Sequence, residues 1–408
     1  MLIELLPKSH NHHRSLPIFG SVLDDFDDWL VAQGYRFSTR QCYILRCTAI
    51  ERYFRSRRQS NLSALTSENF RKCWQFFCHR PGEISGAVIC LQRFLESRQI
   101  LRASGHPPVT ELGAILDSYR QYLREVRGLA AITIEQHCLT SCELARHCLD
   151  HNGKFRLADL TPGHIERFIC SVSSRFSRGS LQHIVAQVRG LLRFLEMRGE
   201  VPSELSSQID TPRVYRLEQL PRALPWDKVW AFLQAIDRSR PSGMRDYAMF
   251  LLVVTYGLRG CDIASLKLSD IDWRADKIHI NQSKTRRPLS LPLTPEVAEA
   301  LLIYLREGRP RSSYREIFLT EHAPILPMRR QAVGGAFRNR VKSATLDISF
   351  YGIHCLRHSF AVRLLRQGVS LKNIGDILGH RSTESTCVYM RLNLEDLREV
   401  ALPLPGSC

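Results

Sequence analysis

Two histidines and an arginine stand close together in residues 354–360, which read HCLRHSF. His354 and Arg357 are three positions apart, so on a helix they would lie one above the other on a single face. His354 and His358 are four positions apart, a spacing that could also hold a metal ion. Neither a carboxylate nor a cysteine pattern completes a metal sphere, and the charge of Arg357 opposes a dication. The cluster therefore favours an anionic substrate over a metal.

A second arginine, Arg259, lies between two glycines in TYGLRGCDIAS (255–265). Gly257 and Gly260 allow the backbone to turn at the end of a buried helix and to aim the guanidinium inward. Asp262 follows three positions later, where it could orient an arginine or cap the next helix. A guanidinium suits phosphate because its planar fork donates two parallel hydrogen bonds. An arginine between two glycines is common, so by itself it does not indicate a phosphate site. It becomes evidence for one only together with the other motifs.

A basic turn is predicted between two short strands in KIHINQSKTRRPLSLPL (277–293), from the alternation of apolar residues and the prolines. Lys284 is followed closely by Arg286 and Arg287. The neighbouring cations should lower the pKa of the lysine, which suits a proton donor. The chain has only nine lysines among 57 basic residues, so we interpret the turn as facing phosphate; a solvated basic turn is the alternative.

A histidine is followed nine positions later by a tyrosine in VSLKNIGDILGHRSTESTCVYMRL (369–392). Ser370 is predicted to cap a short helix that Gly379 ends, and His380 lies just beyond that end. A further helix is predicted to carry Tyr389. By itself this segment could equally be the helix-turn-helix of a DNA-binding protein.

The elements that must position these residues form the last of three predicted domains. Proline-bearing stretches at 101–109 and 201–226 separate the domains. The first two domains are helical by their apolar spacing and look like copies of one module. The predicted domains are 1–105, 110–205 and 220–408. The matching segments are LDDFDDWL (23–30) with LDSYRQYL (116–123), LSALTSENF (62–70) with LADLTPGHI (157–165), and RFLESRQI (93–100) with RFLEMRGE (193–200).

Composition indicates a polyanionic partner. The chain has 57 basic and 40 acidic residues among 408, a formal net charge of +17, which favours nucleic acid. Thirteen cysteines without a Cys-x-x-Cys pair argue against a disulfide framework or a zinc ribbon, and for a reducing cytoplasm. The longest apolar run, 247–258, is too short to span a bilayer, so no membrane association is expected.

Taken together, the motifs of the last domain resemble those of the tyrosine recombinase (phage integrase) family. That family has an arginine in a Gly-Leu-Arg box, a hairpin lysine, a His-x-Leu-Arg-His box, a Leu-Gly-His box and a tyrosine nine residues later. All five are present in order over about 190 residues, and 110–205 more loosely resembles the family's core-binding domain. The matching residues are Arg259, Lys284, His354, Arg357, His380 and Tyr389. Residues 1–105 depart from the common two-domain layout, and we expect them to be an added core-binding-like or arm-type DNA-binding domain.

The resemblance implies a mainly α fold, with helical N-terminal DNA-binding domains and an α+β catalytic domain that has a small antiparallel sheet. It implies that Tyr389 attacks a DNA phosphodiester and forms a 3′-phosphotyrosyl bond. Arg259 and Arg357 would bind the phosphate with His380 as a further donor, His354 would be the acid or base, and Lys284 would protonate the leaving 5′ oxygen. Surrounding cations are expected to lower the pKa of the tyrosine.

The supporting residues expected around this site are Asp262 and His358, with Arg286, Arg287 and Arg381 on DNA. We expect no cofactor and no metal, double-stranded DNA as the partner, and a homo- or hetero-tetramer on paired sites. A cytoplasmic, nucleoid-associated bacterial protein of a mobile element fits these features. The alternatives are a type IB topoisomerase, which shares the constellation but nicks one strand, and a non-catalytic helix-turn-helix protein.

Overall fold

The computed structural model describes residues 2–78, 84–101, 111–148, 159–215, 222–282, 288–344, 346–348, 352–380 and 382–392. By their contacts these residues divide into two compact units, one drawn from 1–62, 72–97 and 219–408 and the other from 63–71 and 98–218. The three predicted domains, 1–105, 110–205 and 220–408, stay a prediction. None of the described helices is long and apolar enough to cross a membrane.

The N-terminal residues form helices that pack among themselves. The long helix α4 contacts α1, α2, α3 and α6. Leu23, Phe26, Ile44, Phe54 and Phe94 lie at 0–1% exposure in the core between them. The elements are α1 Leu2–Leu5, α2 His10–Arg14, η1 Gly20–Val22, α3 Leu23–Ala32, α4 Phe37–Arg55, η2 Leu62–Ala64, α5 Ser67–Phe77 and α6 Ile84–Ser97.

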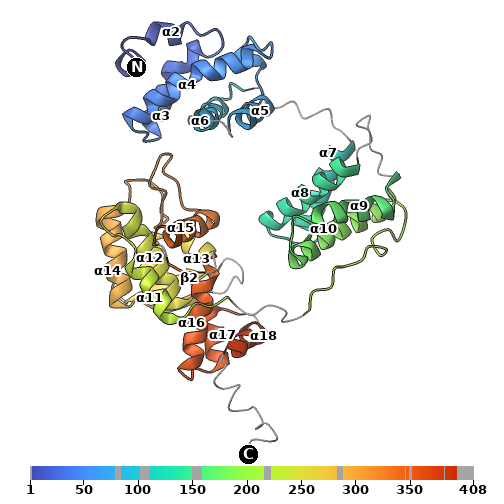
Figure 1. Cartoon of the computed structure of the whole chain (residues 1–408), viewed down its shortest axis with the longest axis vertical. Helices are drawn as coiled ribbons and strands as arrows, with labels where there is room; N and C mark the ends of the chain where they lie inside the picture. The colour runs from blue at the N-terminus through green and yellow to red at the C-terminus, as the bar shows by residue number, and fades with distance from the viewer. Residues whose placement is uncertain are drawn as a thin grey trace, which may run out of the picture. The chain divides into compact units, whose positions relative to one another are not determined.

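Four longer helices make up most of the second unit. Helix α8 contacts α7, α9 and α10 around a core that includes Tyr119, Phe168 and Leu192 (Figure 1). Thr161 caps α9, and the side chain of His164 returns the capping bond. The helices are α7 Glu111–Glu125, α8 Ala131–Cys148, α9 Pro162–Ser173 and α10 Arg178–Met197.

The C-terminal residues surround the buried helix α12, which packs against α11, α14 and α16 (Figure 1). Phe232, Phe250 and Phe337 meet in its core with ring centroids 5.0–5.9 Å apart. The helices are α11 Trp226–Gln234, α12 Pro241–Tyr256, α13 Gly260–Ala264, η4 Leu268–Asp270, α14 Pro295–Ile303, η5 Tyr304–Gly308, α15 Arg330–Ser343, α16 His354–Arg366, α17 Leu371–Leu378, α18 Glu384–Cys387 and η6 Val388–Leu392.

A three-stranded antiparallel sheet, in the order β1-β2-β3, accompanies these helices. The predicted pair of strands is confirmed as β2 Lys277–Asn281 and β3 Pro288–Pro292, paired from Lys277 with Pro292 to Asn281 with Pro288. Ile278 and Ile280 point to the buried side of β2 because successive side chains alternate along a strand. The short β1, Ile271–Asp272, was not predicted. The mainly α fold with a small antiparallel sheet is confirmed.

Residues 309–329, between η5 and α15, are not helical. That stretch is irregular and makes only isolated bridges, Lys267 with Glu316 and Leu319 with Pro327. Prolines at 310, 324 and 327 remove backbone donors that a helix would need.

A second, smaller core lies where α16, α17, α18 and η6 contact one another (Figure 1). Phe360, Ile374, Leu378 and Tyr389 are its members of largest size, each at 8% exposure or less. Burying this tyrosine fixes the position of its ring relative to α16. The chemistry-bearing residues of the C-terminal segment are built around this core.

Candidate active site

The two arginines of the sequence motifs meet at the C-terminal end of α17. Arg357 is 4% exposed and donates from Nη1 to the carbonyl of Gly257 and from Nη2 to that of Leu378, the latter at 2.8 Å. Arg259 donates from Nη2 to the carbonyl of Gly379 at 3.3 Å. Unpaired carbonyls at a helix end carry partial negative charge, which attracts both guanidiniums.

The positive charges are nevertheless held against one another. Burial, and next the charge of Arg259, lower the pKa of Arg357 to about 10. Two like charges this close are stabilised by an anion that contacts both. The pair is therefore suited to bind phosphate.

Glycines make this arrangement possible at two helix ends. Gly257 ends α12 at φ +65°, and a Cβ there would lie 2.6 Å from side-chain atoms of Leu378 and Phe360. Gly379 ends α17 at φ +63°, and a Cβ there would lie 1.9 Å from Oε1 of Gln282. Both residues thus need the left-handed conformation and the small volume that glycine provides. The turn predicted before Arg259 and the predicted end of the helix at Gly379 are confirmed.

His380 is fixed by two ring contacts. Its Nε2 lies 3.2 Å from Nη2 of Arg357, and its Nδ1 lies 2.8 Å from Oγ1 of Thr386. Because a guanidinium only donates, Nε2 accepts and the proton sits on Nδ1. Burial and then the charge of Arg357 lower the pKa of His380 to about 4, so the ring is neutral at pH 7.

Tyr389 lies against two histidines, His358 and His380. Its hydroxyl is 3.1 Å from Nδ1 of His358, and its ring stacks on His380 at 6.4 Å between centroids. The tyrosine is 3% exposed, and burial raises its pKa although Arg357 and Arg259 act to lower it. The sequence interpretation predicted a lowered pKa; in this structure the cost of burying a phenolate outweighs the neighbouring cations.

The histidine on the tyrosine is His358, not His354. His354 is exposed at the first position of α16, and its ring centroid is 6.3 Å from that of His358. Burial, then the charges of His354 and Arg357, lower the pKa of His358 to about 4. The sequence interpretation named His354 as the acid or base and His358 as a supporting residue, and in the structure it is His358 that contacts the Tyr389 hydroxyl.

Gln282 and Thr386 are parts of the site that the sequence interpretation missed. Gln282 is 2% exposed, accepts from Arg259 at 3.2 Å and donates to the carbonyl of Leu378 at 3.4 Å. Thr386 is fully buried beside His380. The sequence offered one signal for Gln282, a polar residue directly after strand β2 and two positions before the predicted Lys284.

The remaining predicted residues divide into one near the site and several outside the described residues. Asp262 is 2% exposed and its Oδ2 lies 4.0 Å from Nη1 of Arg259. It lies inside α13, whose N-cap is Arg259, so it does not cap that helix, and its carboxylate is at ion-pair distance from the arginine. The predicted residues Lys284, Arg286, Arg287 and Arg381 lie outside the described residues.

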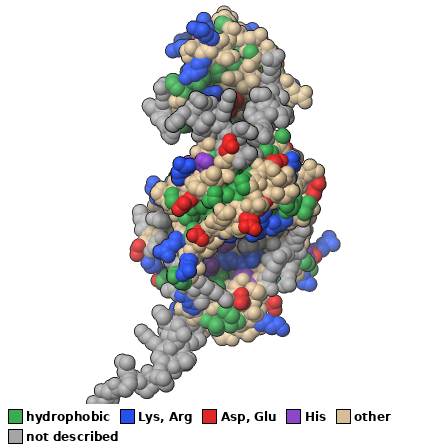
Figure 2. Space-filling model, turned by 90° about the vertical axis from the view of Figure 1, so that its right-hand side faces the viewer, with side chains coloured by type: hydrophobic (Ala, Val, Ile, Leu, Met, Phe, Trp, Pro, Cys, Tyr) green, Lys and Arg blue, Asp and Glu red, His purple; other side chains and the backbone are tan. Residues whose placement is uncertain are grey.

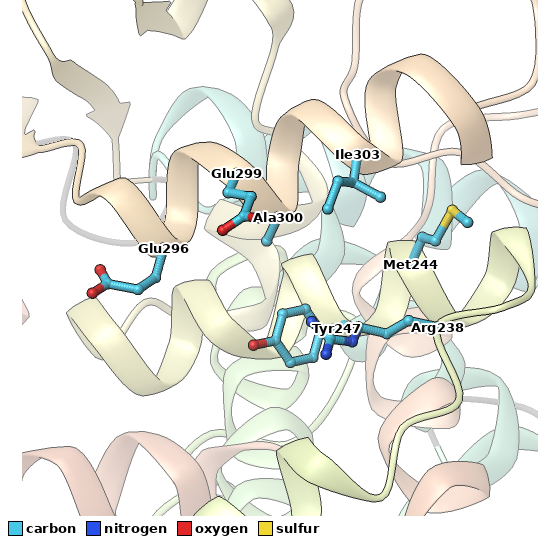
Figure 3. Close-up of a pocket in the computed structure, with 7 residues that line it drawn as sticks. All are labelled: Arg238, Met244, Tyr247, Glu296, Glu299, Ala300 and Ile303. Atoms are coloured by element: carbon cyan, nitrogen blue, oxygen red, sulfur yellow. The ribbon is translucent and has the colours of Figure 1, made fainter.

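A hollow elsewhere in the C-terminal segment is distinct from this cluster. It has a volume of about 130 Å³ and lies between α12 and α14, where Arg238 covers the ring of Tyr247 at 4.5 Å (Figure 3). Its lining includes none of the arginines, histidines or tyrosine described above. Among the described residues no group of three histidines, cysteines or carboxylates could hold a metal ion.

The cluster has the parts needed to displace an oxygen from a phosphate. Two preorganised guanidiniums and an imidazole can stabilise the charge that develops on the non-bridging oxygens. A hydroxyl in contact with an imidazole is the usual arrangement of an activated nucleophile.

Residues 222–396 match the Phage integrase family. A putative integrase/recombinase, y4rA, of Sinorhizobium fredii (strain NBRC 101917 / NGR234) is 31% identical over 391 residues, which cover 94% of this chain and 93% of the relative. The tyrosine recombinase XerD of Lacticaseibacillus casei is 28% identical over 239 residues, covering 58% of this chain and 80% of the relative.

Solved structures share the fold. A lambda integrase (75–356) dimer bound to a COC′ core site is similar over 68% of this chain and 94% of that chain, with a TM-score of 0.53 and 22% identity. The Tn1549 transposon integrase (82–397) with a circular intermediate DNA is similar over 69% of this chain and 99% of that chain, with a TM-score of 0.52 and 18% identity.

Proposed function

Because the chain belongs to the phage integrase family, the tyrosine recombinases, we propose that it is a site-specific recombinase that cuts and rejoins double-stranded DNA. The observation that carries the proposal is the meeting of Arg259, Arg357 and His380 beside the buried hydroxyl of Tyr389. These residues come from four separate segments of the chain. Together their side chains suit one reaction, the attack of an oxygen on a phosphodiester.

In the proposed reaction Tyr389 attacks the scissile phosphorus. The bond from Tyr389 Oη to phosphorus forms, the bond to the 5′ oxygen breaks, and a 3′-phosphotyrosyl link results. Arg259 and Arg357 bind the non-bridging oxygens, and the tyrosine proton passes to Nδ1 of His358. The bound phosphate raises the pKa of that imidazole above its value in the free protein, since a nearby negative charge favours the protonated ring.

Lys284 is proposed to donate a proton to the leaving 5′ oxygen, and His354, at the exposed start of α16, to contact the DNA on the same side. A free 5′ hydroxyl of another strand then attacks the phosphotyrosine and releases Tyr389. The reaction conserves the number of phosphodiester bonds, so it requires neither a metal ion nor a nucleotide.

The domains have separate proposed roles. Residues 220–408 would carry the catalytic site, 110–205 would bind the core DNA sequence, and 1–105 would add a further DNA-binding module. Lys and Arg side chains are scattered among Asp and Glu side chains in Figure 2, and the net charge of +17 suits contact with the phosphate backbone. Arg286, Arg287 and Arg381 are proposed to contact DNA near the cut.

A tetramer on two paired sites is the proposed active assembly, with the segment after residue 393 docking on a neighbouring subunit. A lambda integrase similar in fold to this chain has been seen as a tetramer bound to a Holliday junction. A nucleoid-associated protein of a mobile element is the proposed setting, in keeping with the similarity to a transposon integrase.

The test uses DNA from the borders of the protein's own gene neighbourhood. Incubation with this DNA should give a denaturant-resistant protein–DNA adduct and, on plasmids with two sites, exchanged products. Tyr389→Phe should bind the DNA and give neither. Relaxation of a plasmid without sites, with no exchange, would indicate a type IB topoisomerase instead. Unchanged behaviour of Tyr389→Phe would indicate a non-catalytic DNA-binding protein.

A further inference from the structure

The helices of residues 23–99 repeat the internal geometry of those of 116–199. Phe26 lies 5.3 Å from Phe94, and Tyr119 lies 5.2 Å from Phe194. The matching pairs have interplanar angles of 40° and 42°. In each copy the first ring also stacks on an aromatic residue three positions later, at 6.3 and 6.5 Å. The equivalent rings therefore keep their packing, which supports duplication of one module.

The backbone repeats as well. A glycine with positive φ follows the first helix of each copy, Gly34 at 79° and Gly128 at 58°. The amide directly after this glycine returns to the helix in both copies, with Tyr35 donating to the carbonyl of Leu30 and Leu129 to that of Leu123, each at 3.0 Å. The matched hydrogen bonds align Tyr35 with Leu129, so that residues of the second helix correspond at an offset of 94. A positive φ after the last helix, at Gln99 and at Gly199, gives an offset of 100 there.

The second copy contains a hollow that α7, α8 and α10 line. Its volume is about 340 Å³, and three arginines line it without any carboxylate. A basic hollow of this kind is suited to a small anionic group. The lining residues are Leu123, Arg127, Leu129, Thr133, His137, Ala186, Arg189, Gly190 and Arg193.

In the first copy aromatic side chains occupy the corresponding place. Tyr35 and Tyr43 stand where the second copy has Leu129 and His137, with ring centroids 5.8 Å apart. The hydroxyl of Tyr35 lies 3.1 Å from Sγ of Cys90. A Cβ on Gly86 would lie 3.0 Å from the hydroxyl of Tyr43, so that ring is packed directly against α6.

The arginines also differ between the copies. Arg127 corresponds to Gln33 and Arg189 to Ile89, while Arg193 corresponds to Arg93. The module therefore folds without two of the three arginines, so the fold itself does not require them. Their presence together with an open space indicates a binding role specific to the second copy.

The polar groups of the hollow are already positioned. Arg189 donates from Nη2 to Oγ1 of Thr211 at 2.8 Å and to the carbonyl of Ile209, while its Nε has no hydrogen-bond partner among the described residues. Nδ1 of His137 lies 2.9 Å from the hydroxyl of Tyr119. Burial and then the charge of Arg127 lower the pKa of His137, which favours the neutral ring. In the tautomer in which Nδ1 accepts from the Tyr119 hydroxyl, Nε2 carries a proton that it can donate to a phosphate.

We infer that this hollow binds a phosphate group of the DNA backbone through Arg127, Arg193 and His137. The inference rests on the proposed function for the source of the phosphate. It adds a defined contact point in the second module that the first module, with its tyrosine-filled counterpart, does not have. Arg189, held by Ile209 and Thr211, supplies fixed positive charge beside it.

The test measures how binding of the full chain to a random-sequence duplex depends on salt. Arg127→Gln combined with Arg193→Gln should lower the slope of log affinity against log salt by about 1, the effect of losing one phosphate contact. Both arginines are exposed, so the fold should be retained, and a thermal melt checks this. The matched control is Arg146→Gln, because Arg146 lies nine residues after His137 on α8, on the opposite face. Its slope should equal that of the unmodified chain.

A second arm uses sodium phosphate and the imidazole NMR signals of His137 in the labelled full chain. A phosphate-dependent shift that the double variant loses, together with an unchanged salt slope, would assign the hollow to free phosphate and overturn the DNA assignment. The proposed site would be overturned by equal salt slopes of the double variant and the unmodified chain, with no phosphate-dependent shift of the His137 signals. It would also be overturned if Arg146→Gln lowered the salt slope as much as the double variant does. Adduct formation by the unmodified chain is scored separately. Its absence contradicts the proposed function, whereas an adduct with unchanged slopes contradicts only this inference.

Discussion

Replacing each active-site arginine by lysine should separate its structural contribution from its catalytic one. Arg357 is 4% exposed and donates to two backbone carbonyls, whereas Arg259 makes two long contacts of 3.2 and 3.3 Å. A lysine keeps the charge but has no planar fork, so it cannot reach both carbonyls of Gly257 and Leu378. Each variant should lose adduct formation, because each loses a paired donor to the phosphate.

The two variants should differ in stability. A buried carbonyl left without a donor costs about 1–3 kcal/mol. Arg357→Lys leaves at least one such carbonyl, at a helix end inside the small core of α16, α17 and η6. Arg259→Lys gives up only long contacts, whose net value is about 1 kcal/mol or less. The difference of about 1–2 kcal/mol corresponds to roughly a 5- to 30-fold difference in local opening.

Hydrogen exchange of the full chain, read on peptides of α16 and α17, measures this difference directly. Exchange should be faster in Arg357→Lys by about that factor and close to the unmodified chain in Arg259→Lys. Equal exchange in the two variants would refute the argument that Arg357 holds the end of α17 in place. Retained adduct formation in either variant would refute the assignment of both arginines to the phosphate.

Three further predictions concern the same cluster. Gly379→Ala should cost about 1–3 kcal/mol more than Gly368→Ala in thermal melts, because both need positive φ but only Gly379 faces an occupied space; equal losses would contradict the close approach to Gln282. The pKa values of His358 and His380 are about 4 in the folded protein and about 6.5 in an unfolded chain. Between pH 4 and pH 6.5 the unfolded state therefore binds more protons than the folded state. The melting temperature should fall as the pH drops from 6.5 to 4. A His380→Gln variant should show a shallower fall, and an identical profile would remove His380 from the cause. Adduct formation should be unchanged in EDTA without added nucleotide, and a metal requirement would contradict the proposed mechanism.

Local chemistry in the sequence predicted much of the frame of this site. Glycines at 257 and 379 end their helices as expected, and Ser370 caps α17 by accepting from the amide of Asn373 at 3.2 Å. The β2–β3 pair follows from the alternation of apolar residues along each strand. These features depend on neighbours within a few positions, so a single sequence is enough to find them.

The contact of His358 with Tyr389 depends on packing between elements 31 positions apart, and no local pattern records it. His354 and His358 share one face of a helix, so spacing alone could not decide which of them meets the tyrosine. The pKa of Tyr389 was misjudged for a related reason, because charges are visible in a sequence whereas the extent of burial is not. Gln282 was missed since its role arises from the close approach of Gly379.

The most direct test of the account is to identify the residue that carries DNA. The adduct formed on DNA from the borders of the protein's own gene neighbourhood can be digested with protease and nuclease and sequenced by mass spectrometry. One modified peptide is expected, with a nucleotide joined through its 3′ phosphate to Tyr389. A nucleotide on another residue, or one joined through a 5′ phosphate, would contradict it.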